Sequence, residues 1–335
     1  MRKGEQKIVD CYLELHNDVR RMGLRFRYSA GCSVKAVLLF LPGRWHNSTS
    51  WRPSYADLDV CHYLSIRGYG VASLNYRSHY VNPSCDPQHS LVASGIDDYL
   101  NDILDALVST KQYFGVRRVY LMGFSIGAAL AFLSAGRTEK ASEGFLGVIA
   151  LDGGIAPRSP PCAKEEGGSP VDYRHPFSNS TETLPLIQNP LSLLKIRRLI
   201  QRALSLPKAE EQLNNILPGV GKFDSDGLRQ LLSQDEWWPN RMVQEMEDIT
   251  IGDASSTLSL TNVLSAIDVP ILGICGVEKY GDHHRTAECS SRTTSKDVEL
   301  KYLVGWKHLE VLCGKRAVPH VHSTILSWLE SRWGH

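Results

Sequence analysis

Short apolar runs alternate with longer amphipathic runs along most of the chain, and this alternation limits the folds open to it. The apolar runs are partly β-branched or aromatic and are bounded by Gly, Pro or charged residues, which predicts strands at residues 24–29, 36–42, 71–76, 119–124, 146–153, 270–276 and 298–305. The amphipathic runs predict helices at about 54–67, 94–114, 126–136 and 316–332. Continuous apolar strands between helices favour a mainly parallel sheet with helices on both faces.

One interval, residues 157–268, interrupts the alternation and contains no convincing buried strand. It opens with the polar stretch RSPPCAKEEGGSP and continues with helical patterns at 190–206 and 226–248. We interpret it as a helical lid, because it leaves and rejoins the predicted sheet at the edge where open α/β folds bind ligands. The core is then divided into residues 1–156 and 269–335. A helical subdomain that only adds stability is the alternative.

Composition narrows the class of partner. The chain has 335 residues and a net charge of +1, from 37 basic and 36 acidic residues, so no electrostatic argument favours nucleic acid or a charged membrane. The N-terminus lacks the apolar core of a signal peptide, and no apolar run approaches the roughly 20 residues that span a bilayer. The eight cysteines are scattered without a C-x-x-C pair, which is typical of reduced thiols. These features predict a cytoplasmic protein.

The stretch VYLMGFSIGAALAF, residues 119–132, places Ser125 between two glycines where a predicted strand meets a predicted helix. Residues 123–127 fit the pattern G-x-S-x-G, in which a strained turn exposes the serine and the glycines remove Cβ atoms that would clash. Ser125 then projects at a helix N-terminus, where the Ile126 N–H and the helix dipole favour an oxyanion. A tight turn that merely contains a serine is the alternative.

The chain resembles the α/β-hydrolase superfamily over about residues 25–332. The resemblance rests on the order of the predicted strands, on this strand–serine–helix turn and on the catalytic partners of Ser125 described next. The resemblance implies an eight-stranded, mainly parallel sheet with the lid inserted after strand 6. It also implies a nucleophile, an acid and a histidine in that chain order, with the histidine after the last strand. His308, three residues after Gly305, lies at that point and is expected to activate Ser125. An exposed loop histidine is the alternative.

Three carboxylates are candidates for the acid that orients His308. Many family members carry it three residues after the Gly that ends the strand at 270–276, but this chain has Lys279 there. Asp152 ranks first, because some lipases of this fold place the acid at the end of the strand after the nucleophile strand. An Asp at that point also often just closes the strand in relatives that use the other acid. Glu278 ranks second and Asp282 third.

The resemblance further implies a second oxyanion donor in the loop after residues 36–42. The family often has His-Gly there, whereas this chain has Pro-Gly-Arg-Trp. The Arg44 N–H is the expected donor, because a backbone group serves regardless of side chain. Trp45, the next candidate donor, and Tyr76, at the end of the following strand, are assigned to the substrate pocket. Packing is an equally good interpretation of Tyr76.

A serine nucleophile with a histidine base and an oxyanion hole performs acyl transfer, which predicts a serine hydrolase or acyltransferase for an ester or thioester, with no cofactor or metal. The wording GYGVASLNYRSHYV and GWKHLEVLCG more loosely resembles fungal polyketide-pathway thioesterase-like α/β-hydrolases. That resemblance implies release of a polyketide or fatty acyl chain from an acyl carrier protein by hydrolysis or lactonisation. A general cytosolic carboxylesterase or lipase and a non-catalytic ligand-binding protein of the same fold are the alternatives.

Overall fold

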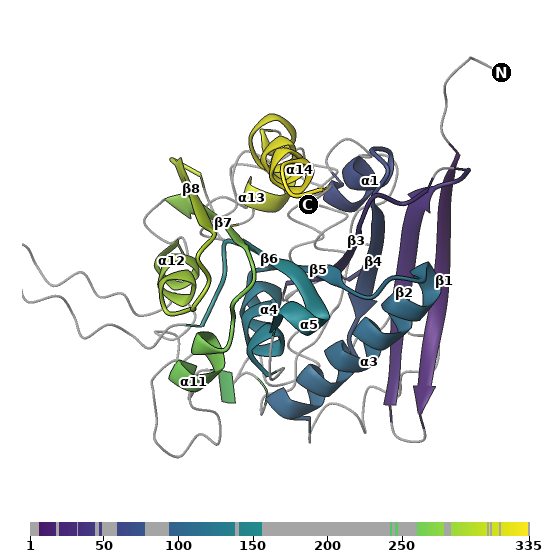
Figure 1. The fold of residues 1–335 in the computed structure, drawn as a ribbon, viewed down its shortest axis with the longest axis horizontal. Coiled ribbons are helices and arrows are strands. Elements are labelled where there is room, and N and C mark those ends of the chain that lie inside the picture. Colours follow the sequence, from purple (N-terminus) through teal and green to yellow (C-terminus); the bar gives the residue numbers. More distant parts are fainter. Residues whose placement is uncertain are drawn as a thin grey trace, which may run out of the picture.

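The computed structural model describes residues 7–17, 20–31, 33–43, 47–48, 59–77, 94–137, 141–155, 242, 245–246, 260–277, 283–306, 308, 310–314 and 316–333. These residues form one eight-stranded sheet with the strand order β1-β2-β4-β3-β5-β6-β7-β8 (Figure 1). The strands are β1 (Ile8–Asn17), β2 (Arg20–Ser29), β3 (Val37–Leu41), β4 (Gly70–Asn75), β5 (Val119–Phe124), β6 (Phe145–Leu151), β7 (Ile271–Val277) and β8 (Val298–Val304). The predicted sheet is confirmed.

The six strands from β4 to β8 in the sheet order are parallel to one another, and β2 runs antiparallel to both of its neighbours, β1 and β4. Both faces of β3 and β5 are buried, which explains their unbroken apolar sequences. The sequence interpretation missed β1, whose described side chains are half-buried or exposed at the edge of the sheet. A strand with one solvated face carries polar residues such as Asp10 and Glu14, and so lacks the apolar signal of the central strands.

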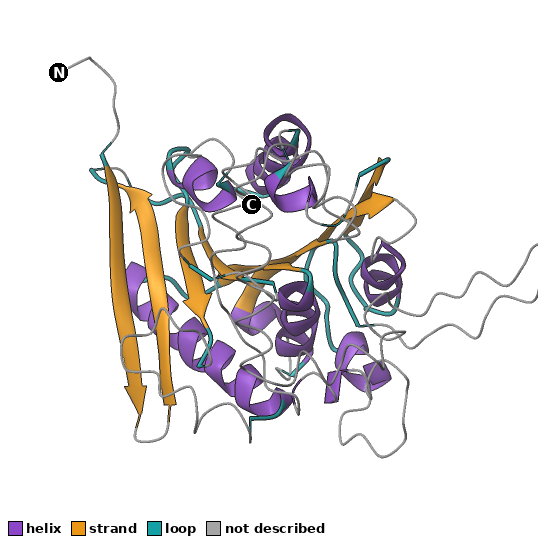
Figure 2. Ribbon diagram, turned by 180° about the vertical axis from the view of Figure 1, so that it is seen from behind, coloured by secondary structure: helices purple, strands orange, loops and turns teal. Residues whose placement is uncertain are grey.

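Helices cover both faces of the sheet, as Figures 1 and 2 show. One face is covered by α1 (Val60–Ser65), α13 (Glu310–Cys313), the π-helix η2 (Val318–His322) and α14 (Ser323–Glu330), and the other by α3 (Ile96–Phe114), α4 (Ile126–Gly136), α11 (Leu260–Ser265) and α12 (His283–Ser291). The short α5 (Ala141–Gly144) leads into β6. A hydrophobic core lies on each face of the sheet, and successive side chains of a central strand point into opposite cores. Leu39 faces the α4 side and Phe40 faces the α14 side.

The predicted C-terminal helix at 316–332 is interrupted in the structure. It begins with the π-helical turn η2 and becomes an α-helix only at Ser323. Pro319 lies in that first turn, where its missing backbone N–H removes no hydrogen bond within the helix.

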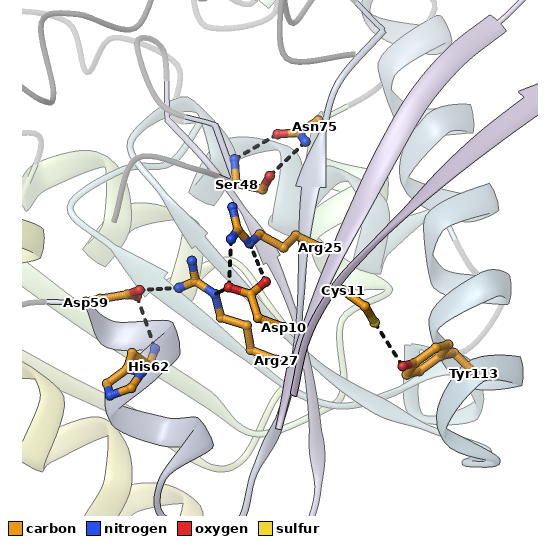
Figure 3. Close-up of polar contacts among 9 residues, drawn as sticks. All are labelled: Asp10, Cys11, Arg25, Arg27, Ser48, Asp59, His62, Asn75 and Tyr113. Atoms are coloured by element: carbon orange, nitrogen blue, oxygen red, sulfur yellow. Dashed lines mark hydrogen bonds and ion pairs between the residues drawn. The ribbon is translucent and has the colours of Figure 1, made fainter. Parts of the chain in front are cut away.

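Ion pairs fasten the β1–β2 hairpin to α1 (Figure 3). The Arg25 guanidinium donates twice to the Asp10 carboxylate, at 2.6 Å each, and Arg27 lies between Asp10 and the fully buried Asp59. Asp59 also caps α1 by accepting the Cys61 N–H at 2.8 Å and the His62 N–H at 3.1 Å. The pairing offsets part of the cost of burying these charges, although burial still raises the pKa of Asp59, and it fixes α1 against the sheet.

Most of the predicted lid lies outside the described residues. Of residues 157–268, the structure describes Met242, Glu245, Met246 and the segment 260–268. Met242 and Met246 are buried in the core beside α3 and α4, and the Glu245 carboxylate accepts the Ile96 N–H at 2.6 Å at the N-terminus of α3. This part of the interval therefore packs directly against the core. The lid boundaries stay a prediction.

Candidate active site

Ser125 occupies a strained turn between β5 and α4. Its backbone has φ 55° and ψ −123°, a combination that few L-residues adopt. Glycines on each side make the turn possible: a Cβ on Gly123 would lie 2.2 Å from the Gly127 carbonyl oxygen, and one on Gly127 would lie 2.1 Å from that of Leu41. The turn places Ser125 at the N-terminal end of α4, as the sequence pattern predicts.

Asp152 directly follows β6 and also has a positive φ, of 45°. Its side chain is fully buried, and Oδ1 accepts a hydrogen bond of 2.9 Å from the Gly276 N–H in β7. The Asp152 N–H itself extends the sheet by donating to the Ile274 carbonyl at 2.8 Å. The first bond holds Oδ1 of the carboxylate, and the second fixes the backbone of the residue that carries it.

His308 connects these two residues. Its Nδ1 lies 2.7 Å from Asp152 Oδ2, and its Nε2 lies 2.9 Å from Ser125 Oγ. The Phe124 ring stacks on the imidazole, with centroids 4.9 Å apart and 27° between the ring planes. With Nδ1 protonated, His308 donates to Asp152 and accepts the serine proton, so the three groups form one chain of proton donors and acceptors.

Sheet topology explains why groups so distant in sequence meet. β5, β6, β7 and β8 are parallel neighbours, so the chain leaves each of them at the same edge of the sheet. Ser125 follows β5, Asp152 follows β6, and His308 follows β8. Open α/β sheets bind ligands at this carboxyl edge.

A buried thiol, that of Cys275, interacts electrostatically with the Asp152 carboxylate. Burial, with the Asp152 charge nearby, raises the pKa of Cys275 to about 12. Cys275 is therefore a neutral thiol at physiological pH. It adds no second negative charge next to Asp152.

Residues 38–247, more than half of the chain, match a family model described as the alpha/beta hydrolase family. The chain belongs to the alpha/beta hydrolase family. A search of curated proteins found no sequence match.

Solved structures of other proteins superpose on most of the chain. A Sulfolobus solfataricus protein described as a candidate lipase has a TM-score of 0.67 and 20% identity, over 97% of this chain and 95% of its own. A soluble variant of monoglyceride lipase from Saccharomyces cerevisiae, in complex with a substrate analogue, has a TM-score of 0.63 and 15% identity, over 100% and 99%. Naproxen esterase from Bacillus subtilis has a TM-score of 0.55 and 13% identity, over 97% and 92%. At these identities the likeness establishes the fold.

Of the two expected oxyanion donors, the Ile126 N–H lies among the described residues and the Arg44 N–H does not. Ile126 is the first residue of α4, where backbone N–H groups have no partner inside the helix. Arg44 lies outside the described residues, as does Trp45. Gly43, just before them, lies against the nucleophile, because a Cβ there would be 3.1 Å from Ser125 Cβ.

The end of β4 holds the loop that contains Gly43. Asn75 accepts the Ser48 N–H at 2.7 Å and donates to the Ser48 hydroxyl at 2.8 Å, and all of these groups are buried (Figure 3). Tyr76 is also fully buried, with its hydroxyl 3.4 Å from the Pro42 carbonyl oxygen. These contacts support the packing interpretation of Tyr76.

The other candidate acids, Glu278 and Asp282, lie outside the described residues. Sequence reasoning missed two groups that the site uses, the Gly276 N–H and the Phe124 ring. Phe124 is the second residue of the G-x-S-x-G pattern and Gly276 ends an apolar run, but nothing local shows that either touches the acid or the histidine. Among the described residues, no helix is long and apolar enough to cross a membrane.

Proposed function

We propose that this chain is a serine hydrolase that transfers the acyl group of a carboxylic ester or thioester through Ser125. One observation carries the proposal: Ser125 Oγ, His308 and Asp152 are joined by contacts of 2.9 and 2.7 Å. A serine alone is a poor nucleophile, and a histidine oriented by a buried carboxylate is the arrangement that activates it.

In this mechanism Ser125 Oγ attacks the substrate carbonyl while His308 Nε2 removes the hydroxyl proton. Asp152 stabilises the resulting imidazolium and keeps its ring oriented. The Ile126 N–H, with the Arg44 N–H as the proposed second donor, stabilises the oxyanion of the tetrahedral intermediate. His308 then protonates the leaving alcohol or thiol. Water or a substrate hydroxyl cleaves the acyl-enzyme in the second half-reaction, which gives an acid or a lactone.

A fluorophosphonate probe tests the nucleophile directly. We expect the wild-type protein to be labelled, and Ser125→Ala to lose the label. Ser134→Ala is the matched control, because Ser134 is a buried serine on the same helix α4 and is not in the site. Labelling that persists in Ser125→Ala would contradict the proposal. Absence of labelling in every variant would favour the non-catalytic ligand-binding alternative.

The proposal also concerns which acyl group the protein transfers and what carries that group. The resemblance to polyketide-pathway enzymes favours a thioester on an acyl carrier protein, whereas the superposed structures include proteins named as lipases and an esterase. Matched substrates separate the two: the same acyl chain presented as a glycerol ester, as a simple thioester and on a carrier protein. A kcat/KM at least 100-fold higher on the carrier would support thioesterase specificity, and preference for the glycerol ester would support the lipase alternative.

A further inference from the structure

The turn that holds Asp152 is tied to α12 by side chains outside the proposed triad. Thr286 Oγ1 accepts the Gly153 N–H at 3.0 Å and donates to the Gly153 carbonyl oxygen at 2.8 Å. One turn further along the same helix, the Cys289 thiol contacts both the N–H and the carbonyl oxygen of Ile155. A hydroxyl has one proton to donate and two lone pairs, so Thr286 can make both bonds at once.

This contact is closely packed. Gly153, Thr286 and Cys289 are all buried, so water cannot replace the hydroxyl at the Gly153 peptide groups. A Cβ on Gly154 would lie 2.7 Å from the Arg285 carbonyl oxygen, so the backbone of the turn approaches that of α12 closely. Thr286 therefore replaces the hydrogen bonds that a neighbouring strand would otherwise supply just beyond the end of β6.

The same turn touches the nucleophile. A Cβ on Gly153 would lie 2.0 Å from the Ser125 carbonyl oxygen, so Gly153 packs between the elbow and α12. Asp152, the residue before it, has the unfavourable φ of 45° that the surrounding contacts must maintain. A shift of the Gly153 peptide would move the Asp152 carboxylate away from His308.

We propose that Thr286 is a positioning residue that holds Asp152 in hydrogen-bonding distance of His308 by binding both peptide groups of Gly153. The effect on turnover rests on the proposed serine hydrolase function, but the effect on the Asp152–His308 contact does not. Thr286 is fully buried and reaches the acid through the backbone of the turn, and its side chain also forms a hydrogen bond with the Cys275 thiol.

The test removes the hydroxyl and keeps the shape. Thr286→Val should lower kcat about 10- to 100-fold with little change in KM, because small misplacements of a catalytic group cost about this much. Thr286→Ser should restore the rate, and Thr286→Cys, with a weaker donor and acceptor, should fall between them. Thr294→Val is a control away from the site, because the Thr294 hydroxyl also donates to backbone carbonyls, those of Ser265 at 3.0 Å and Ile267 at 3.1 Å, but from an exposed position. It should leave kcat unchanged.

A double-mutant cycle separates positioning from general stabilisation. In an Asp152→Asn background, Thr286→Val should change kcat by less than about twofold, because the carboxylate that it positions is gone. Multiplicative losses, or a Thr286→Val rate equal to that of wild type, would overturn the inference. If Thr286→Val does not fold, the comparison rests on the other two variants. The inference then requires kcat of wild type and Thr286→Ser to exceed that of Thr286→Cys, and equal rates would overturn it.

Proton NMR provides a readout that does not depend on turnover. The hydrogen-bonded Nδ1 proton of His308 should give a downfield resonance in wild type and in Ser125→Ala, and it should broaden or shift upfield in Thr286→Val. An unchanged resonance in Thr286→Val contradicts the inference even if the protein is inactive. Wild-type turnover in Ser125→Ala, by contrast, would contradict the proposed function alone.

Discussion

His308 Nδ1 lies 2.7 Å from Oδ2 of Asp152, a residue 156 positions earlier in the chain. The Asp152 carboxylate is fully buried, and its other oxygen is held by the Gly276 N–H. Removal from water strengthens its electrostatic interaction with an imidazolium on His308. This geometry supports Asp152 as the acid of the proposed triad.

Asp152→Asn should lower kcat by about 10⁴-fold, because an amide cannot stabilise the imidazolium and can stabilise the wrong tautomer of the histidine. Glu278→Gln and Asp282→Asn should stay within about twofold of wild type in the same steady-state assay. A larger loss of kcat in Glu278→Gln than in Asp152→Asn would instead assign the acid to Glu278, which follows β7 in the sequence.

Gly127→Ala should destabilise the fold severely. The added Cβ would lie 2.1 Å from the Leu41 carbonyl oxygen, so the backbones of α4 and β3 must separate, at a cost of more than about 3 kcal/mol in the free energy of unfolding. Gly115→Ala is the control: Gly115 has φ +66° but no atom within 4 Å of the added Cβ, so strain alone should cost about 1 kcal/mol. Urea unfolding measures both, and equal losses would contradict the steric explanation.

Asp102→Asn should cost about 3 kcal/mol in the free energy of unfolding. The fully buried Asp102 carboxylate makes two 2.8 Å bonds to the Arg77 guanidinium, and the amide would leave that buried cation, among the described residues, with only the partly exposed Asp98 carboxylate, at 3.1 Å, as its ion-pair partner. Asp97→Asn is the matched control on the same helix: Asp97 pairs with Arg137 but is 59% exposed, so its loss should cost under about 1 kcal/mol. Comparable losses in thermal or chemical unfolding would contradict the role given to burial.

Stability should depend on pH through His322. Burial lowers the pKa of His322 from 6.5 to about 4. Between these pH values the unfolded chain binds a proton that the folded chain does not, so the free energy of unfolding falls as pH drops. For this group the loss is on the order of 3 kcal/mol, complete by about pH 4.

His322→Phe removes the titrating group and keeps a ring beside Tyr63, whose centroid is 5.4 Å from that of His322. The variant should lose less stability than wild type between pH 6.5 and 4 in urea unfolding curves. His320→Phe, at an exposed position, should keep the wild-type slope. Parallel curves for wild type and His322→Phe would show that His322 does not cause the acid sensitivity.

Local sequence accounts for the elements whose signals lie in a few neighbouring residues. The buried strands β3 and β5 are apolar throughout, and α4 begins and ends where the Ala-rich run does. The edge strand β1 was missed because one of its faces meets solvent, and the turn η2 because a proline near the start of a helix does not specify the hydrogen-bond pattern that follows.

The sequence by itself determined that Ser125 would stand on a glycine-flanked turn between a strand and a helix, because the steric reason lies within residues 123–127. It ranked Asp152 first among three acids but could not choose, since the choice depends on groups that approach from elsewhere. Only the tertiary structure decided that His308 reaches Asp152, with Gly276 and Thr286 holding the acid in place. Parallel strands bring these residues to one edge of the sheet, and distance along the chain carries no record of that proximity.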